Sequence, residues 1–265
     1  HYFDPHFSYV RHPDHPFSEG YEGTLEDPIT VAALTSRATF DASDVRFVRD
    51  VYDEEVAYTD REIGRLVASL ADLDIAARTT IYVTADHGEA FFERGKFGHG
   101  TDLYAELVRV PLLVGGRVPE SLAGSVVKTP VEVASVPATI LAQVGGEGAP
   151  FPGIDLLAGD LDPARPSFSE GSFARGDRHL KTAVVQGRWK LIRDLESGDE
   201  ELFDIQVDPR EAVDLSPDPP VEARAVLDFL RGALDGLGRQ ASGEGRRLEL
   251  DEAEVEHLRS LGYGE

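Results

Sequence analysis

The sequence predicts an α/β protein, with a mostly parallel sheet and helices in residues 1–165 and a small antiparallel sheet with a packed helix after them. Residues 44–73 carry apolar side chains at helical spacing, with charged side chains on the other face. Residues 80–84 form a short, β-branched apolar run, which is typical of a buried strand. A helix that leads into a buried strand is an αβ unit and favours a parallel sheet. From about residue 166 the chain changes to short runs between turn-prone residues, which indicates antiparallel strands.

The other elements of the first region follow from the same patterns. We expect Ser43 or Asp44 to cap the helix over 44–73. A second apolar run predicts a strand at 108–114. A further helix is expected over 135–144, where it would begin with Ser135 as its cap and end at a pair of glycines.

The C-terminal region is predicted to contain short strands, a hairpin with its turn at Gly187, and an amphipathic helix over 221–237. Residues 240–247 are rich in Gly, Ser and charge, which predicts a flexible linker. We therefore expect three parts: the first α/β region over 1–165, an antiparallel subdomain over 166–240, and a linker with a docking helix over 241–265.

Composition narrows the kind of protein and partner. Of 265 residues, 41% are hydrophobic, and no apolar run is long enough to cross a membrane. The absence of Cys excludes disulfides, thiolate metal sites and cysteine nucleophiles from this sequence. A net charge of −23 disfavours nucleic acid and anionic membranes as partners, because both are polyanions. An anionic substrate would need local positive charge, which a bound cation supplies.

Asp86 and His87 directly follow the strand predicted at 80–84, at the end where open α/β sheets place their ligands. A second imidazole, His99, stands between two glycines a few residues later. A carboxylate oxygen and an imidazole nitrogen suit a divalent metal. The same residues have a plainer interpretation, since an Asp at a strand end often caps a helix and a loop histidine is often only solvated. The residues alone leave both interpretations open.

The segment from Thr84 to Leu112 closely resembles the C-terminal metal-binding segment of the sulfatases, a family of the alkaline phosphatase superfamily. The residues that carry the resemblance are Thr84 to Glu89, Gly98 to Gly100, Leu103, Tyr104, Glu106 and Arg109 to Leu112. The resemblance implies a three-layer, alkaline-phosphatase-like fold for the first region. It also implies that Asp86 and His87 are metal ligands, with calcium or magnesium as the metal. His99 would contact the substrate or, in two-metal relatives, a second cation.

Residues 1–9 are similar to the sulfatase stretch in which a strand ends in a loop that faces the active site. By that match His6 donates a hydrogen bond to the transferred group, although a surface turn with exposed histidines explains the residues alone. His99 is also a candidate general acid, because imidazole exchanges protons readily near neutral pH. Many sulfatases carry a Lys after the His-Gly of this loop. Residues 101–104 contain none, and Lys96 is the candidate to bind the substrate in its place.

The resemblance implies a nucleophile that this sequence does not contain. Sulfatases use a formylglycine made from Cys or Ser in a Cys/Ser-x-Pro/Ala-x-Arg motif, and the chain has no such motif. We expect the formylglycine and an acidic ligand pair upstream of His1, and we expect this polypeptide alone to be catalytically inactive. No secretory signal is visible. A targeting segment is expected in the same upstream part, together with a periplasmic or extracellular location.

Three functions stay open. The favoured one is a metal-dependent sulfuric ester hydrolase acting on a small-molecule or carbohydrate sulfate ester, because residues 189–192 and 208–211 also resemble C-terminal sulfatase elements. The second is a phosphate-directed relative, a phosphodiesterase or phosphoethanolamine transferase with zinc or manganese. The third is a catalytically silent, carbohydrate-binding relative. The sequence does not fix the number of subunits.

Overall fold

The structure is a computed structural model that describes residues 1–100, 102–146, 153–159, 161–173 and 179–241. The chain divides into two compact units, His1–Pro219 and Pro220–Glu265. Within the described ranges, none of the helices combines the length and apolarity that crossing a membrane requires. The finer division into 1–165, 166–240 and 241–265 stays a prediction. The docking helix expected within 241–265 and most of the linker expected at 240–247 lie outside the described residues.

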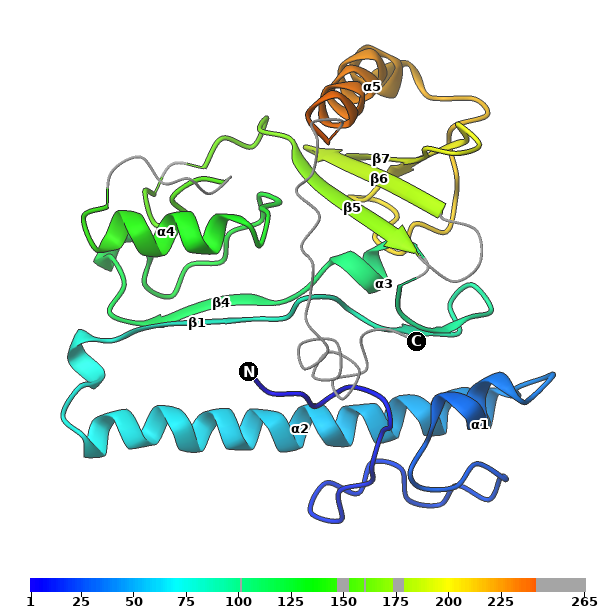
Figure 1. Ribbon diagram of the computed structural model, residues 1–265, viewed down its shortest axis with the longest axis vertical. Coiled ribbons are helices and arrows are strands. Elements are labelled where there is room, and N and C mark those ends of the chain that lie inside the picture. Colours follow the sequence, from blue (N-terminus) through cyan, green and yellow to red (C-terminus); the bar gives the residue numbers. More distant parts are fainter. Residues whose placement is uncertain (101, 147–152, 160, 174–178, 242–265) are drawn as a thin grey trace, which may run out of the picture. The chain divides into compact units, whose positions relative to one another are not determined.

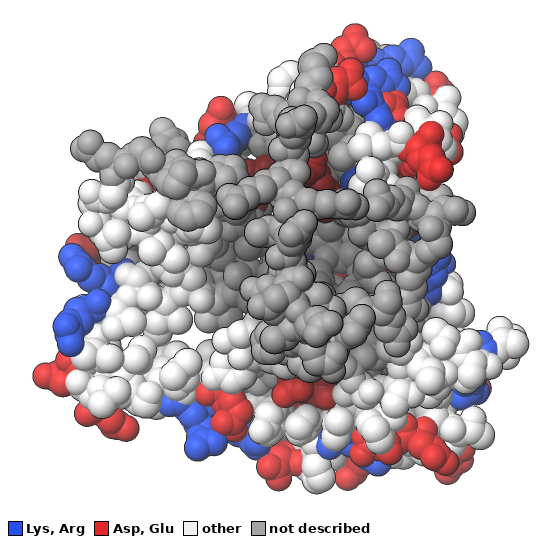
Figure 2. Space-filling model, in the orientation of Figure 1, with Lys and Arg blue, Asp and Glu red and all other residues white. Residues whose placement is uncertain are grey.

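The longest helix, α2 (Ala42–Asp72), confirms the helix predicted over 44–73. Its cap is Asp41, whose carboxylate accepts hydrogen bonds from the amides of Ser43 and Asp44, while Asp44 accepts one from the Asp41 amide. The cap expected at Ser43 or Asp44 is therefore wrong: Asp41 has the extended backbone of a cap, with φ −89° and ψ 176°. Figure 2 shows acidic and basic side chains interspersed along the lower edge of the view, where α2 lies.

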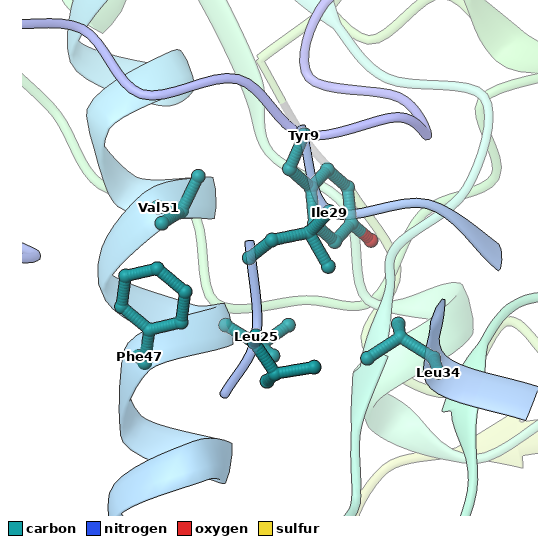
Figure 3. Packing of buried hydrophobic residues seen from close by; sticks show 7 residues of the cluster. Tyr9, Leu25, Ile29, Leu34, Phe47 and Val51 are labelled. Carbon is teal, nitrogen blue, oxygen red and sulfur yellow. The ribbon is translucent and has the colours of Figure 1, made fainter. Parts of the chain in front are cut away.

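A hydrophobic core forms where the buried face of α2 meets the N-terminal segments (Figure 3). Its buried residues are Tyr9, Leu25, Ile29, Leu34, Phe47, Val48 and Val51. Tyr9 and Ile29 exchange backbone hydrogen bonds of 3.0 and 2.8 Å in an isolated antiparallel bridge. Leu34 comes from the short helix α1 (Val31–Thr35), which Thr30 caps. Because Tyr9 is fully buried in this core, the loop that carries His6 is anchored close to α2.

The strand predicted at 80–84 is β1 (Thr80–Thr84), which follows a 3-10 turn, η1 (Ala76–Arg78). The burial expected for this strand is wrong for the structure described, in which each of its residues is partly buried or exposed. It pairs with β4 (Leu112–Gly116) in antiparallel register, with Thr80 opposite Gly116 and Thr84 opposite Leu112. Helix α3 (Ala105–Val108) ends where the strand predicted at 108–114 was expected to begin, so β4 starts later. Figure 1 shows the β1–β4 ribbon between α2 and a second helix, α4 (Ser135–Gln143).

The mostly parallel sheet is not seen in the described residues, where every strand pair is antiparallel. A parallel neighbour for β1 would require a long crossover connection, usually a helix that covers the sheet. The chain instead returns from β1 to β4 through a small hairpin, β2 (Ala90–Phe91) and β3 (Phe97–Gly98), and through α3. The helix and strand of the predicted αβ unit, α2 and β1, are therefore present, but this pattern does not determine the direction of the neighbouring strand.

The C-terminal antiparallel sheet is confirmed. Its strands are β5 (Ser167–Phe173), β6 (His179–Gln186), β7 (Trp189–Asp194) and β8 (Glu200–Asp204), hydrogen-bonded in that order. The predicted turn at Gly187 joins β6 to β7, and its φ of +59° is a conformation that favours glycine. On one face of the sheet, Ala183, Ile192 and Phe203 form a second core with Leu103, which lies just beyond the β2–β3 hairpin.

The remaining elements are a 3-10 turn and a helix in the first unit and one helix in the second unit. A 3-10 turn, η2 (Glu120–Leu122), follows β4. Helix α4 confirms the helix predicted over 135–144, but its cap position is Ala134, which makes no side-chain cap. Ser135 is not the cap because its hydroxyl is used elsewhere, accepting a hydrogen bond of 3.2 Å from the Ile154 amide. In the second unit, α5 (Val221–Ala241) contains the helix predicted over 221–237.

Candidate active site

The candidate site is built where β1 ends and the β2–β3 hairpin begins. Asp86 and His87 follow β1 after one intervening residue, Ala85, and the chain then turns at Gly88. The Gly88 amide donates a hydrogen bond of 2.7 Å to the Leu107 carbonyl, and a Cβ at this position would lie 2.1 Å from the Glu106 carbonyl oxygen. The turn therefore requires glycine for close approach of two backbones. The hairpin then delivers His99 immediately after β3.

Three histidines from three separate segments, His6 near the N-terminus, His87 after β1 and His99 after β3, lie together at this point. The rings of His87 and His99 are stacked, with centroids 4.0 Å apart and an interplanar angle of 27°. The His6 ring lies 5.1 Å from that of His99 and 6.4 Å from that of His87. We call these residues the histidine cluster. The side chains of His87 and His99 are 32% and 25% exposed, so the cluster is reachable from solvent.

Asp86 lies beside the cluster with its side chain 64% exposed. One carboxylate oxygen accepts a hydrogen bond of 3.0 Å from the His87 amide, and the other lies 3.9 Å from His87 Nε2. The other ring nitrogen, His87 Nδ1, lies 2.8 Å from the Gly88 carbonyl oxygen. A carbonyl only accepts, so this contact favours the tautomer with hydrogen on Nδ1 and a lone pair on Nε2, the nitrogen on the side of Asp86.

This pair has the right chemistry for part of a cation site. Metal ligands with bonds of about 2.0 to 2.4 Å are separated by about 3 to 4 Å when they are neighbours in the coordination sphere, which the 3.9 Å between Asp86 Oδ2 and His87 Nε2 satisfies. A histidine ligand also typically donates its other N–H to a carbonyl or carboxylate. Among the described residues, no three His, Cys, Asp or Glu side chains are placed so that together they could hold a metal ion, so the pair fits a divalent cation only with further donors.

Glu89 and Tyr9 support His99 and were not predicted as site residues. The Glu89 side chain is 4% exposed and lies 3.2 Å from His99 Nδ1. The Tyr9 hydroxyl donates a hydrogen bond of 2.7 Å to the same carboxylate. Burial, followed by the nearby Glu89 charge, raises the pKa of Tyr9, so this hydroxyl stays a donor. The sequence does contain a signal for Glu89, because its carboxylate stands between Gly88 and the apolar run at 90–92. A carboxylate that is buried in such a run needs a hydrogen-bond partner.

Among the described residues, no contact joins Lys96 to the histidine cluster. It occupies the turn before β3, its side chain is exposed, and its carbonyl accepts a hydrogen bond of 2.9 Å from the Phe92 amide. Its role in substrate binding stays a prediction. His12, which is not a member of the cluster, stacks on Tyr58 with ring centroids 4.3 Å apart and offers a comparison histidine.

Curated relatives share most of this chain with modest identity. Arylsulfatase K from Mus musculus is 28% identical over 210 residues, which is 74% of this chain and 37% of the relative. Choline-sulfatase from Rhizobium meliloti (strain 1021) is 27% identical over 194 residues, 70% of this chain and 36% of the relative. The chain therefore matches well under half of the length of these curated relatives.

Solved structures of similar fold include a 2-O GAG sulfatase, with a TM-score of 0.70 and 21% identity over 83% of this chain and 49% of that one. The phosphonate monoester hydrolase of Silicibacter pomeroyi has a TM-score of 0.65 and 22% identity over 90% of this chain and 50% of that one. At these identities the likeness shows the fold alone.

The family model described as Sulfatase matches residues 2–146, a range that includes α2, β1, the hairpin and all three histidines of the cluster. Since this match spans more than half of the chain, the protein belongs to the sulfatase family.

Proposed function

We propose that the protein acts, in its full-length form, as a metal-dependent sulfuric ester hydrolase. The observation that carries the proposal is the convergence of His6, His87 and His99, from three separate segments, beside Asp86. Membership of the sulfatase family supports sulfate esters as the substrate class. A small-molecule or carbohydrate sulfate ester is the proposed substrate.

In this proposal Asp86 Oδ2 and His87 Nε2 hold a divalent cation, calcium or magnesium. The cation would offset the negative charge of the sulfate group and of the leaving oxygen. The His6 ring lies 5.1 Å from the His99 ring and 6.4 Å from the His87 ring, and His6 and His99 would donate hydrogen bonds to sulfate oxygens. Glu89 would accept the Nδ1 hydrogen of His99, which leaves His99 Nε2 to give a proton to the leaving group. Lys96 is proposed as a further substrate contact that requires movement of its exposed side chain.

The nucleophile is proposed to lie in polypeptide beyond this sequence. The chain has neither Cys nor a Cys/Ser-x-Pro/Ala-x-Arg motif, and the curated relatives it matches are more than twice as long as the shared region. We propose that a formylglycine and the missing metal ligands come from that part, and that these 265 residues alone are inactive. The same part would supply the parallel strands of a three-layer sheet. None of the residues of β1 is buried, which supports such a covering neighbour. We also propose a periplasmic or extracellular location.

A phosphate-directed activity is the second candidate. The observation that favours it is that the cluster is made of histidines, while Lys96, the lysine proposed to bind the substrate, makes no contact with it among the described residues. Zinc or manganese would then be the expected metal.

The test is hydrolysis by the full-length protein of 4-nitrophenyl sulfate, compared with 4-nitrophenyl phenylphosphonate and bis(4-nitrophenyl) phosphate. We expect the sulfate to be cleaved fastest, EDTA to abolish turnover, and calcium or magnesium to restore it. His99→Ala should lower kcat by about 100-fold or more, as expected for loss of a general acid. His12→Ala is the matched control, because His12 stacks on Tyr58 outside the cluster. Faster cleavage of either phosphorus ester would move the assignment to the second candidate.

A further inference from the structure

Residues Asp102 to Leu107, the 102–107 segment, connect the histidine cluster to the C-terminal sheet. The segment follows the loop that carries His99, and its Leu107 carbonyl accepts the Gly88 amide at 2.7 Å. A Cβ on Gly88 would lie 2.1 Å from the Glu106 carbonyl oxygen. The backbone next to His87 is therefore in direct contact with the 102–107 segment, and a displacement of the segment would displace His87.

Side chains of the C-terminal sheet region hold the other side of the segment. Leu103 packs into the core formed by Ala183, Ile192 and Phe203. The polar contacts are Lys181 Nζ to Asp102 at 2.8 Å, Lys190 Nζ to the Leu103 carbonyl at 2.7 Å, Tyr104 hydroxyl to Glu201 at 2.8 Å, and the Ala105 amide to Glu211 at 3.0 Å. The segment is thus fixed on the sheet through its backbone as well as through its side chains.

Lys190 and Glu211 stand out because both are buried and charged. Their side chains are 3% and 2% exposed, and Lys190 Nζ lies 2.8 and 3.0 Å from the two Glu211 oxygens. Burial lowers the pKa of Lys190, while the Glu211 charge opposes that effect. A buried ion pair contributes little net stability compared with apolar residues of the same size. The pair also satisfies two backbone groups of the segment: Lys190 donates to the Leu103 carbonyl, and Glu211 accepts from the Ala105 amide.

Arg94 joins the β2–β3 hairpin to the same assembly. Its guanidinium donates to the Glu106 carboxylate at 2.7 Å and to the Glu211 carbonyl at 2.7 Å. It also lies over the Tyr104 ring, with its Cζ atom 3.7 Å from the ring centroid. This hairpin leads directly to His99, so Arg94 connects His99 to Glu211. His87 is connected to the same Lys190–Glu211 pair through Gly88 and the 102–107 segment.

We propose that Lys190 and Glu211 are positioning residues for the histidine cluster, and that they act through the 102–107 segment. The C-terminal sheet would then help to position the histidines of the site, in addition to forming a subdomain of its own. The catalytic consequence of this inference rests on the proposed function, whereas the structural coupling does not. Lys190 and Glu211 do not touch the cluster themselves, so their effect should appear in the order of the site and not in substrate contacts.

The direct test is amide hydrogen exchange of Gly88, measured by NMR in wild type and in the double variant Lys190→Met/Glu211→Gln. Changing both partners avoids leaving one buried charge unpaired, which would endanger folding. We expect the Gly88 amide to exchange about tenfold faster or more in the variant, because its acceptor Leu107 is released. Amides in α2 should change by less than about twofold. Unchanged exchange at Gly88 in the folded variant would overturn the inference.

Two further variants keep the test decisive. Leu191→Ala removes a fully buried side chain from β7 and makes none of the polar contacts with the segment, so it is the control for general destabilisation of the sheet. If it accelerates Gly88 exchange as much as the double variant does, the inference fails. If the double variant does not fold, Arg94→Met provides the measurement from the hairpin side, with the same faster exchange of Gly88 expected and its absence contrary to the inference.

An activity measurement then separates positioning from substrate binding. In the full-length protein, the double variant should lower kcat for 4-nitrophenyl sulfate by about tenfold or more while KM changes by less than about threefold. A change in KM alone would contradict a positioning role. If wild type cleaves none of the esters tested, the proposed function fails, and Gly88 exchange still decides whether Lys190 and Glu211 order the site.

Discussion

Glu55 on α2 offers a test of how the N-terminal loop is held next to the site. The residue is 1% exposed, and one of its carboxylate oxygens accepts a hydrogen bond of 2.7 Å from the Val10 amide. The other oxygen is buried and has no hydrogen-bond partner among the described residues. Burial raises the pKa of Glu55 to about 7, and the charges of Asp4 and Asp27 add to the effect.

The folded chain holds the Glu55 proton up to a higher pH than the unfolded chain does, and this decides the sign of the effect on stability. The unfolded chain ionises Glu55 near pH 4.5, whereas the folded chain keeps the proton until about pH 7. The unfolded state therefore loses its proton first, and stability falls as the pH rises through this window. The difference between the two pKa values corresponds to about 3.4 kcal/mol in total, of which about 2 kcal/mol lies between pH 5.5 and 8.5. That range stays above the isoelectric point of about 4.6, where an acidic chain would precipitate.

The assay is urea unfolding of Glu55→Gln and wild type at pH 5.5 and pH 8.5. Glutamine replaces the ionisable group by a neutral one of the same shape, and the constant cost of burying its amide cancels between the two pH values. The unfolding free energy of the variant, relative to wild type, should rise by about 2 kcal/mol on going to pH 8.5. Glu26→Gln, at an exposed position, is the control and should show no such change. An equal difference at both pH values would refute the reasoning.

Three further changes probe the site directly. Gly88→Ala should destabilise the fold by about 1 to 3 kcal/mol in urea unfolding, because its Cβ would lie 2.1 Å from the Glu106 carbonyl oxygen; an unchanged midpoint would contradict that contact. Tyr9→Phe should cost about 1 to 3 kcal/mol by the same measurement, since it removes the hydroxyl that donates to buried Glu89, and a neutral effect would mean that Glu89 has another donor. Asp86→Ala in the full-length protein should weaken calcium or magnesium binding at least about tenfold in isothermal titration calorimetry, and full affinity would exclude Asp86 as a ligand.

The elements that could be predicted from the sequence are those fixed by neighbours along the chain. The apolar spacing in α2, the β-branched run of β1 and the glycine turn between β6 and β7 are local patterns, and each predicted element is present. The cap of α2 was missed because Asp41, Ser43 and Asp44 are all acceptable caps by type, and only the backbone conformation distinguishes them. The direction of β4 was missed because strand pairing depends on residues far away in the sequence.

The residues of the candidate site also divide into those that a short stretch of sequence predicts and those that depend on contacts between distant residues. Asp86, His87 and His99 stand out as residue types in a short stretch, and the resemblance added His6. Glu89 and Tyr9 were missed because their hydrogen bond joins residues 80 positions apart, and neither residue type signals such a partner by itself. The same holds for Lys190 and Glu211, whose effect on the segment beside Gly88 depends on contacts between residues that are distant in the sequence.

The charges around the histidine cluster bear on how an acidic protein recognises an anion. Within the part of the chain that the structure describes, two carboxylates lie against the cluster, Asp86 beside His87 and Glu89 beside His99. Two carboxylates cancel much of the positive charge that the histidines could carry, so the cluster alone is a weak site for sulfate. A cation held by Asp86 would reverse this balance, because it neutralises the carboxylate and adds positive charge at the same point. Binding of the anion should therefore follow binding of the metal, and sulfate affinity that is equal with and without EDTA would show that the anion is recognised by other residues.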